Sequence, residues 1–456
     1  MYRALTRFAL PTGLVLALSL AAFAQTAQLV EFPDPAKFYQ NSSFIIDRNV
    51  AFVPTYDNDT LWSFSTVTGE LLDPNGLALA GNASDPFLFA GDKLAMPGWF
   101  PNQGVFVADI SDPANIKEIG VISLPTTTNI QGQEIAVDEN GYIGYVAGFP
   151  NDTLYSFNVN TLQLEDMDGL VLPGNPDRIA LGADYRLAIV DTTNKVIMVV
   201  DVADPANLTL IGTITLPGTG SFGSNDVIAI AEDGHTAYIA ADNRVLYSFD
   251  LATMSVLDPD GVSFGTQGGS YGVVLHGDRA AVPWDRGLTF FDISDPTNLT
   301  VVSNAAFGGT VAPQGNGVVS FSQDGTKAIM PVIYPGNYVY SFYVETGAQF
   351  ATRYEVSAQP NLTAIYGADL IGVLCNSGDN SKIWLIGGLL DGDWAADMNC
   401  DGVIDNFDIS PFLAALLDPT TYQEDYPLCD PMNADCNDDG EVNNFDIKPF
   451  IDLLLG

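Results

Sequence analysis

The 456-residue sequence predicts a mainly β protein: an eight-bladed β-propeller, with seven blades as the fallback count, followed by a small α-helical domain. Three observations predict this fold. A strand-like segment recurs eight times at steps of 43 to 49 residues. The segments that follow it alternate between two kinds. The C-terminal end carries a duplicated acidic loop, and each copy precedes an apolar segment long enough for a short helix.

The segment before the repeats, residues 1–24, has the pattern of a secretory signal peptide. Arg3 and Arg7 lead into an apolar run that ends in small-x-small at 22–24, which predicts cleavage before Gln25. No other apolar run approaches the ~18–20 residues that a membrane span requires. We therefore expect a secreted or cell-surface protein with no membrane span.

The composition limits the possible partners. The chain has 56 acidic and 16 basic residues, a formal charge of −40, so nucleic acid and anionic membranes are unfavourable partners. A hydrophobic content of 47% excludes a disordered chain. Cations and neutral ligands stay possible.

The repeated segment predicts the second strand of each blade within residues 25–390. Odd-numbered units continue into a strand ending in Tyr-Ser-Phe or Trp-Ser-Phe. Units two, four and six continue into Asp-Pro-x-Asn, which favours a tight turn. Units of 40–50 residues with about four strands each are typical of propeller blades. The small residues at the centres of the repeated strands are Ala51, Ala95, Gly144, Ala188, Ala237, Ala280, Ala328 and Gly372.

The two ends of the repeat region predict how the ring closes. The last unit ends at KIWLIGGLL (382–390) and lacks the outer strand found in the other even-numbered units. The segment QLVEF (28–32) lies before the first unit and is similar to those outer strands. We expect it to pair with the eighth unit, which would remove an exposed sheet edge.

Units with Ser-Asp-Pro-Ala-Asn or a close variant (107–115, 199–207 and 290–298) resemble the LVIVD repeat family. Units with Tyr-Ser-Phe resemble the related YVTN-type repeats. Together the resemblance covers residues 28–390. It implies a propeller of the kind found in bacterial exported proteins, most of which have no defined activity.

The motifs of common catalytic sites are missing from the sequence. His235 and His276 are the two histidines, and each lies in a predicted turn. No Ser lies in a G-x-S-x-G nucleophile elbow: GVSFG (261–265) and GGSYG (268–272) match the letters, but no helical periodicity follows them. There is also no H-E-x-x-H or phosphate-binding loop. The sequence thus favours a non-catalytic role, with a carbohydrate-active enzyme (glycoside hydrolase or lyase) in polysaccharide breakdown as the alternative. Carboxylates around the ring axis would favour the enzyme, and apolar or amide groups would disfavour it.

The loops between the second and third strands are rich in aromatic residues, and we expect them on the face where propellers usually bind ligands. Such rings, flanked by acids, suit stacking on a carbohydrate or anchoring a protein partner. The alternative is that they pack hairpins against neighbouring blades. The candidate ligand-binding residues are Tyr56, Trp99, Phe100, Phe149, Trp284 and Tyr334.

The duplicated loops near the C-terminus have the spacing of EF-hand calcium loops, with oxygen ligands at positions 1, 3, 5, 7 (backbone), 9 and 12 and Gly at position 6. We therefore expect two Ca²⁺ ions. The predicted ligands of the first are Asp397, Asn399, Asp401, Val403, Asp405 and Asp408. Those of the second are Asp435, Asn437, Asp439, Glu441, Asn443 and Asp446.

One helix follows each loop, and position 12 is Asp. This arrangement resembles a type I dockerin of the kind found in planctomycete exported proteins, with a linker at 391–396 and the domain at 397–456. The resemblance implies calcium-dependent folding and docking onto a cohesin-like or other cell-surface protein. Positions 10 and 11 are Asn-Phe in both copies instead of small hydroxyl residues. Four phenylalanines either contact another partner or fill the domain core: Phe407, Phe412, Phe445 and Phe450.

Four cysteines in an exported chain favour disulfides over catalytic thiols. Three pairings are possible, and the sequence does not choose among them. The four residues are Cys375, Cys400, Cys429 and Cys436.

Overall fold

The structure is a computed structural model. It describes residues 26–33, 44–55, 58–99, 104–125, 130, 135–148, 151–191, 193–217, 228–265, 269–306, 319–322, 325–332, 337–349, 354–356, 359–366, 370–376, 382–387, 395–396, 398, 404, 406–419, 422, 426, 431–437 and 442–455.

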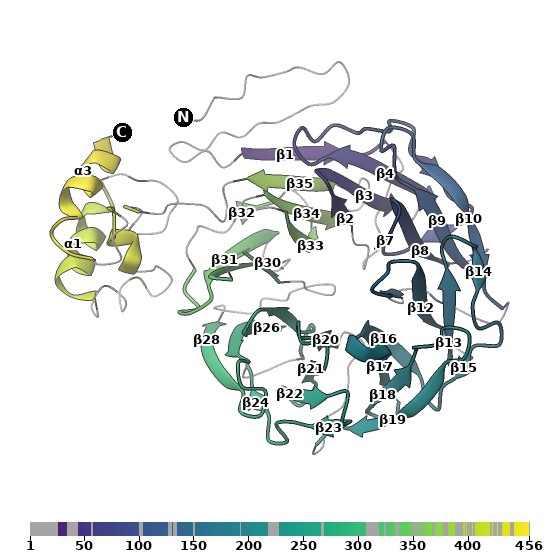
Figure 1. The fold of residues 1–456 in the computed structure, drawn as a ribbon. Coiled ribbons are helices and arrows are strands. Elements are labelled where there is room, and N and C mark those ends of the chain that lie inside the picture. Colours follow the sequence, from purple (N-terminus) through teal and green to yellow (C-terminus); the bar gives the residue numbers. More distant parts are fainter. Residues whose placement is uncertain are drawn as a thin grey trace.

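Eight antiparallel sheets are arranged as a ring around a central axis, which confirms the count of eight blades (Figure 1). In the odd-numbered blades the outermost strands are short, because turn-forming residues interrupt the chain after the third strand. Blade 1 contains β2 (Ile45–Asp47), β3 (Val50–Thr55), β4 (Thr60–Ser65) and β5 (Leu77–Ala78). Blade 3 contains β11 (Ile135–Val137), β12 (Ile143–Gly148), β13 (Thr153–Asn158), β14 (Gln163–Leu164) and β15 (Leu170–Val171). Blade 5 contains β20 (Ala229–Ile230), β21 (Thr236–Ala241), β22 (Val245–Asp250), β23 (Ser255–Val256) and β24 (Val262–Ser263). Blade 7 contains β29 (Ser320–Phe321), β30 (Lys327–Val332), β31 (Tyr338–Tyr343) and β32 (Tyr354–Glu355).

The even-numbered blades have long outer strands. Blade 2 contains β6 (Asn82–Ala83), β7 (Phe87–Phe89), β8 (Lys93–Trp99), β9 (Gly104–Asp109) and β10 (Lys117–Ser123). Blade 4 contains β16 (Pro176–Leu181), η1 (Ala183–Tyr185), β17 (Arg186–Asp191), β18 (Val196–Asp201) and β19 (Thr209–Thr215). Blade 6 contains β25 (Val274–His276), β26 (Arg279–Trp284), β27 (Gly287–Asp292) and β28 (Thr300–Ala306). Blade 8 contains β33 (Gln359–Tyr366), β34 (Leu370–Asn376), β35 (Lys382–Gly387) and β1 (Thr26–Glu31).

The N-terminal strand closes the ring, as the sequence predicts. β1 pairs antiparallel with β35, with Val30 opposite Ile383 and Glu31 opposite Lys382. The Lys382 ammonium lies 3.2 Å from a Glu31 carboxylate oxygen. The closing strand therefore gives blade 8 the outer strand that its own segment lacks, and no edge of β35 is left unpaired.

In blades 1, 3, 5, 6 and 7 the small residue at the centre of the repeated strand lies opposite a phenylalanine on the next strand. Gly144 lies opposite Phe157 in the β12–β13 pair. A Cβ added at Gly144 would lie 2.2 Å from the ring of Phe157, which is fully buried. Ala237 faces Phe249 in the same way in blade 5. Packing between strands thus explains why both the small residue and the Tyr-Ser-Phe signature recur.

The serine of the Tyr-Ser-Phe or Trp-Ser-Phe signature joins blades 1, 3 and 5 to the blade that follows each. Ser248 donates a hydrogen bond to the carbonyl of Pro296, at 2.5 Å, and Ser156 donates to the carbonyl of Pro205. The equivalent residue of blade 1, Ser63, donates to Pro113 at 2.5 Å. The acceptor is always the proline of the Asp-Pro-x-Asn turn. At these interfaces the odd-numbered blade therefore supplies the serine donor, and the even-numbered blade supplies the proline carbonyl.

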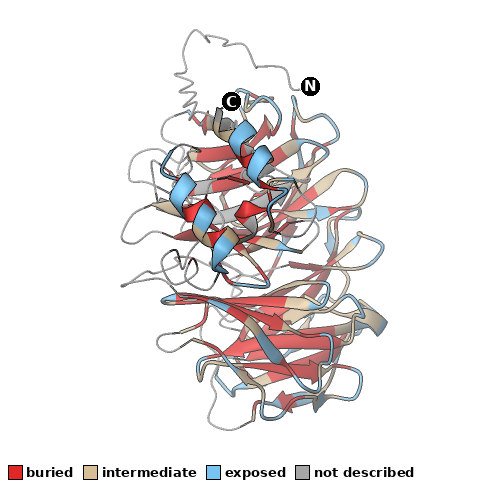
Figure 2. Ribbon diagram, turned by 90° about the vertical axis from the view of Figure 1, so that its left-hand side faces the viewer, coloured by how far each residue is buried: buried red, intermediate tan, exposed pale blue. Residues whose placement is uncertain are grey.

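The tail is a small helical body beside the ring (Figure 1). It contains α1 (Ile409–Leu417), η2 (Pro431–Ala434) and α3 (Ile447–Leu455). Phe412 of α1 and Phe450 of α3 stack with their ring centroids 4.0 Å apart. Figure 2 shows that much of the outward surface of both helices is exposed, whereas the blade strands are mostly buried. Within the described residues, no helix is long and apolar enough to span a membrane.

The cysteine expectation is wrong for Cys375. This residue lies on β34, is fully buried and has a free thiol, and its Sγ lies 3.9 Å from the Val373 carbonyl. Burial raises the pKa of this thiol, because the thiolate would lose its hydration. The Cys436 thiol donates to the carbonyl of Asn433 at 3.8 Å. Cys400 and Cys429 lie outside the described residues.

Candidate calcium loops and the loop face of the propeller

In the tail, the helix that follows each predicted calcium loop begins directly after the aspartate at position 12 of that loop. Asp408 and Asp446 are both fully buried. Their carbonyls accept the first helical hydrogen bonds, from Phe412 and Phe450, at 2.8 Å each. The Asp408 side chain makes no capping bond to α1. Its Oδ1 instead accepts a 2.7 Å bond from the backbone N–H of Met398, at position 2 of the first loop. The carboxylate is therefore turned back toward the start of its own loop.

The second loop is arranged in the same way. Asp446 Oδ1 accepts from the backbone N–H of Asn437, position 3, at 3.2 Å. Asp446 Oδ2 accepts from the N–H of Asn443, position 9, at 2.8 Å. Asp435, position 1, is only 9% exposed. Positions 3 and 9 of this loop are thus held against position 12, as in a calcium loop, and the position-1 carboxylate is nearly buried.

The oxygen donors of these loops fit a hard divalent cation. Buried carboxylates are costly unless a cation or several hydrogen bonds compensate them. The one lysine of the tail, Lys448, is mostly exposed and pairs with Asp452 on the outer side of α3. Calcium held by the predicted ligand set would supply the missing positive charge.

Seven predicted calcium ligands lie outside the described residues: Asp397, Asn399, Asp401, Val403, Asp405, Asp439 and Glu441. Among the residues that the structure does describe, no three His, Cys, Asp or Glu side chains form a metal-binding group.

On the propeller, the aromatic loops do join the second and third strands of their blades, as expected. Trp284 is 4% exposed, and its indole N–H donates to Thr289 Oγ1 at 3.1 Å. A Cβ at either Gly265 or Gly287 would lie 2.7 Å from the indole. Trp284 also belongs to the same buried cluster as Tyr238 and Leu246, so it packs against blade 5, which is the alternative role considered above. Tyr56, Phe100, Phe149, Tyr334 and the side chain of Trp99 lie outside the described residues.

The described part of this face contains polar contacts that the sequence did not reveal. The Tyr271 hydroxyl donates to Asp285 Oδ1 at 2.7 Å, and the Gly269 N–H donates to Asp285 Oδ2 at 3.3 Å. Burial raises the pKa of Tyr271, and the hydrogen bond to Asp285 raises it further. Asp285 directly follows Trp284 and is one of the acids that flank the aromatic loop residues in the sequence. Tyr271 lies in the connection from blade 5, which has no repeated signature that would have indicated it.

Tyrosines of the Tyr-Ser-Phe signature hold the neighbouring turns. The side-chain amide of Asn243 donates to the Tyr247 hydroxyl at 2.8 Å. Asn151 donates to Tyr155 in the same way, at 2.9 Å. The tyrosine therefore has a structural role within its own blade, alongside the serine that joins two blades.

The innermost strands are mostly apolar in the part of the chain that the structure describes. Their carboxylates are Asp47, at the end of β2, and Asp177, on β16. Burial raises the pKa of Asp177, and the neighbouring Arg178 partly offsets this effect. His276 stacks on Phe321 with centroids 5.6 Å apart, and His235 Nε2 lies 3.6 Å from Asp184. Within the described residues, the carboxylates of the inner strands thus come from two separate blades, 1 and 4.

Comparison with known families supports the repeat assignment. The LVIVD repeat matches residues 173–215 and 267–306, which span blades 4 and 6. The chain contains LVIVD repeats. Both matched blades carry the Asp-Pro-x-Asn turn that accepts the serine bond from the preceding blade. No curated protein matches the chain.

Solved structures with similar folds have low sequence identity to this chain. The C-terminal WD40 domain of Sif2 has 12% identity and a TM-score of 0.59, covering 79% of this chain and 99% of that one. The computationally designed protein Ika8 has 12% identity and a TM-score of 0.55, with coverage of 78% and 98%. A functionally unknown protein from Desulfotomaculum acetoxidans has 12% identity and a TM-score of 0.50, with coverage of 74% and 100%. At such identities the similarity shows the fold alone.

Proposed function

We propose that the protein is an exported, non-catalytic recognition protein. Its propeller presents a ligand or partner surface, and its tail attaches it to a cell-surface or extracellular assembly in a calcium-dependent manner. The signal-peptide pattern of residues 1–24 supports export. The apolar inner strands support a binding role over hydrolysis.

The observation that carries the proposal is a duplicated apolar face on the two tail helices. Three pairs of equivalent residues, each 38 positions apart, have nearly equal exposure. Phe407 and Phe445 are 68% and 71% exposed, Ile409 and Ile447 are 40% and 39%, and Leu413 and Ile451 are 46% and 44%. Exposed phenylalanine and branched aliphatic side chains in this number are typical of an interaction surface.

The buried face of the same helices has a different set of residues. Phe412 and Phe450 are 2% and 3% exposed and stack on each other in the core of the tail. The four phenylalanines therefore divide into two structural and two outward-facing residues. We propose that the outward-facing phenylalanines and the aliphatic residues beside them contact the partner. The partner would need a matching apolar face.

Calcium would control this surface through the loops. Asp408 and Asp446 each contact the start of their own loop and begin the helix that carries the apolar face. Ligation would fix the loop and the first helical turn together, since metal binding supplies folding free energy in domains of this size.

A pull-down with the whole chain as bait tests this proposal. Cell-envelope and secreted fractions are compared in calcium and in EGTA, with the double variant Phe407→Ser, Phe445→Ser as the second bait. A partner retained in calcium, released in EGTA and lost in the double variant is the expected result. The matched control is Met167→Ser, which removes an equally exposed apolar residue from blade 3. A partner that the double variant retains would exclude the tail face as the contact.

A further inference from the structure

The turns that join the first and second strands lie on the face opposite the aromatic loops, since successive connections in an antiparallel meander alternate between the two ends. On this face two tyrosines of consecutive blades are exposed. Tyr142, before β12, is 42% exposed, and Tyr185, before β17, is 40% exposed. Neither residue belongs to a repeated signature, and neither has a role in the packing between strands described above.

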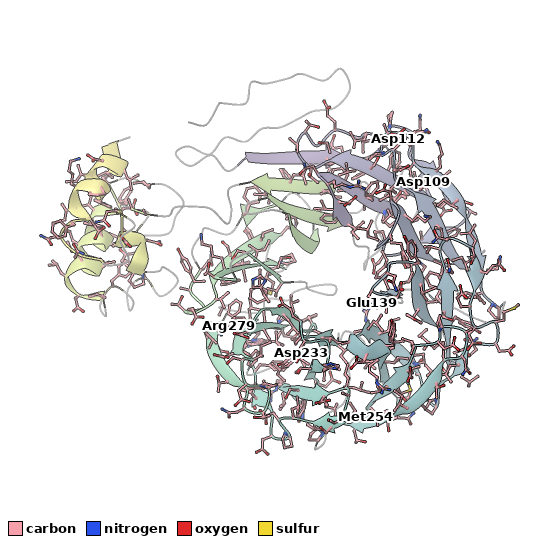
Figure 3. All side chains as sticks on the ribbon, viewed as in Figure 1. Asp109, Asp112, Glu139, Asp233, Met254 and Arg279 are labelled. Carbon is pink, nitrogen blue, oxygen red and sulfur yellow. The ribbon has the colours of Figure 1, made fainter. Side chains whose placement is uncertain are left out.

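A carboxylate holds the two turns together. The Tyr185 hydroxyl donates to Glu139 Oε1 at 3.1 Å, and Glu139 lies three residues before Tyr142 in the turn of blade 3. This bond, and the charge of Glu139, raise the pKa of Tyr185, so the hydroxyl stays protonated at neutral pH. Figure 3 labels Glu139 at the inner edge of the ring. The bond fixes the Tyr185 ring beside the turn that carries Tyr142.

The backbone at Tyr185 is unusual for its residue type. Asp184 and Tyr185 have φ values of 51° and 58°. In the equivalent turns of blades 1 and 2, the last residue is also at positive φ, but it is Asn49 or Asp92. Asn and Asp tolerate this region, whereas a bulky side chain rarely adopts it. The turn itself therefore does not require the Tyr185 ring, since Asn or Asp forms the same turn in blades 1 and 2.

The charges around the two rings are mainly negative. Asp184 has a 76% exposed side chain, and Glu139 contacts Tyr185 directly. The nearby basic side chains already have acidic partners: Arg186 lies 3.7 Å from Asp201, and His235 lies 3.6 Å from Asp184. The whole chain has a formal charge of −40. Exposed aromatic rings beside carboxylates bind ammonium and guanidinium groups through cation–π and ionic contacts together.

We infer that the Tyr142–Tyr185 surface binds a lysine- or arginine-bearing segment of a protein partner. The rings contact the cationic side chain, and Glu139 and Asp184 pair with its charge. The negative field of the protein attracts the segment, while the rings give this surface a preference over the other acidic turns. The site is separate from the tail and from the aromatic loops, so it goes beyond the function proposed above.

Fluorescence anisotropy with the whole chain tests the inference. The probe is a labelled octapeptide of alternating lysine and glycine, in physiological salt. Tyr185→Asn places at position 185 the residue found in blade 1, so the fold should be retained with equal or greater thermal stability. Combined with Tyr142→Ser, it should weaken binding by about 5- to 25-fold, from two exposed cation–π contacts. Tyr185→Phe keeps the ring and should retain most of the affinity.

The controls separate the rings from the overall charge. Asp92→Asn changes the charge of a neighbouring turn without touching either ring, and it should leave the affinity within about twofold, the size expected of one exposed charge. An unchanged affinity in the tyrosine double variant would overturn the inference, since binding would then follow charge alone. Tyrosine-dependent binding of neutral cellohexaose, with none of the lysine peptide, would also overturn it and assign the surface to carbohydrate.

Discussion

Leu162 of blade 3 occupies the space that a side chain on Gly120 of blade 2 would need. A Cβ added at Gly120 would lie 2.7 Å from Leu162 Cδ1. Blades 4 and 5 repeat the arrangement, with a Cβ at Gly212 lying 3.2 Å from Met254 Sδ. Both apolar residues have a φ of 55°, in a turn where blades 1 and 7 have glycine. A glycine on the outer strand of one blade thus matches a large turn residue on the next.

This contact predicts a stability effect that a second substitution relieves. Gly120→Val should lower the free energy of unfolding by about 1–3 kcal/mol, because the added methyl groups overpack the blade 2–blade 3 interface. The double variant Gly120→Val, Leu162→Ala should recover part of that loss. Urea denaturation measures both. Equal loss in the single and double variants would show that Leu162 is not the group in conflict.

The interblade serines provide a matched pair of substitutions. Ser248→Ala removes the bond to the Pro296 carbonyl and should cost about 1–2 kcal/mol, because a buried acceptor loses its donor. Ser341 is its equivalent in blade 7, and its buried Oγ has no hydrogen-bond partner among the described residues. Ser341→Ala should therefore be neutral or stabilising. Urea denaturation measures both variants. Equal losses in the free energy of unfolding would contradict a stabilising role for the Ser248 hydrogen bond.

The Asp-Pro turns predict a pH dependence of stability. The side-chain and backbone bonds from Ser294, at 2.6 and 2.9 Å, lower the pKa of Asp292 below its usual value near 3.8. A lowered folded-state pKa gives stability that is complete above the unfolded pKa and lost as the pH falls through the folded one. Wild type should therefore exceed Asp292→Asn in urea midpoint at pH 6, and the difference should shrink below about pH 4. A difference independent of pH would contradict this assignment.

Calcium removal should affect the tail and leave the propeller intact. In differential scanning calorimetry, EGTA should shift one small transition to lower temperature and leave the main one in place, because ligand binding to the folded state alone stabilises it by about 2.7 kcal/mol at 100 times Kd. Asp446→Asn should remove much of the calcium response. Asp452→Asn makes the same charge change on the outer side of α3 and should not. A response equal in both variants would indicate general charge screening.

Ring closure predicts an oligomerisation defect. Deleting residues 26–31 removes β1 and exposes the backbone donors and acceptors of β35. We expect dimers or aggregates by size-exclusion chromatography with light scattering, because unpaired edges associate. Adding the separate peptide of residues 26–32 should restore the monomer. A stable monomer without the peptide would mean that β1 is not needed to protect this edge.

The sequence predicted the blades well because the repeats reflect local packing that every copy must satisfy. Gly144 and Phe157 recur as a pair across two neighbouring strands, so their spacing is visible in the chain. The role of Trp284 was not visible in that way. Its indole is covered by Gly265, which comes from the connection between two blades. The same reason hid Tyr271, the donor to Asp285.

For the tail, too, the sequence indicated some features and left others open. The loop spacing alone predicted the ligand positions, and the buried position-12 carboxylates Asp408 and Asp446 are consistent with it. The sequence left open which phenylalanines form the core, because each copy of the motif has one phenylalanine just before the helix and one inside it. The answer depends on how α1 packs on α3, where Phe412 meets Phe450.

The pairing of Thr26 with Gly387 also sets the order of folding. The first strand of the ring cannot complete its sheet until the last strand is available, so the earliest segment to emerge stays unpaired for the longest time. Contacts between positions this far apart in the chain slow folding, because a long loop must be closed before they form. A chain that starts at β2 and carries β1 directly after β35 would remove that delay, and it should refold faster to the same ring.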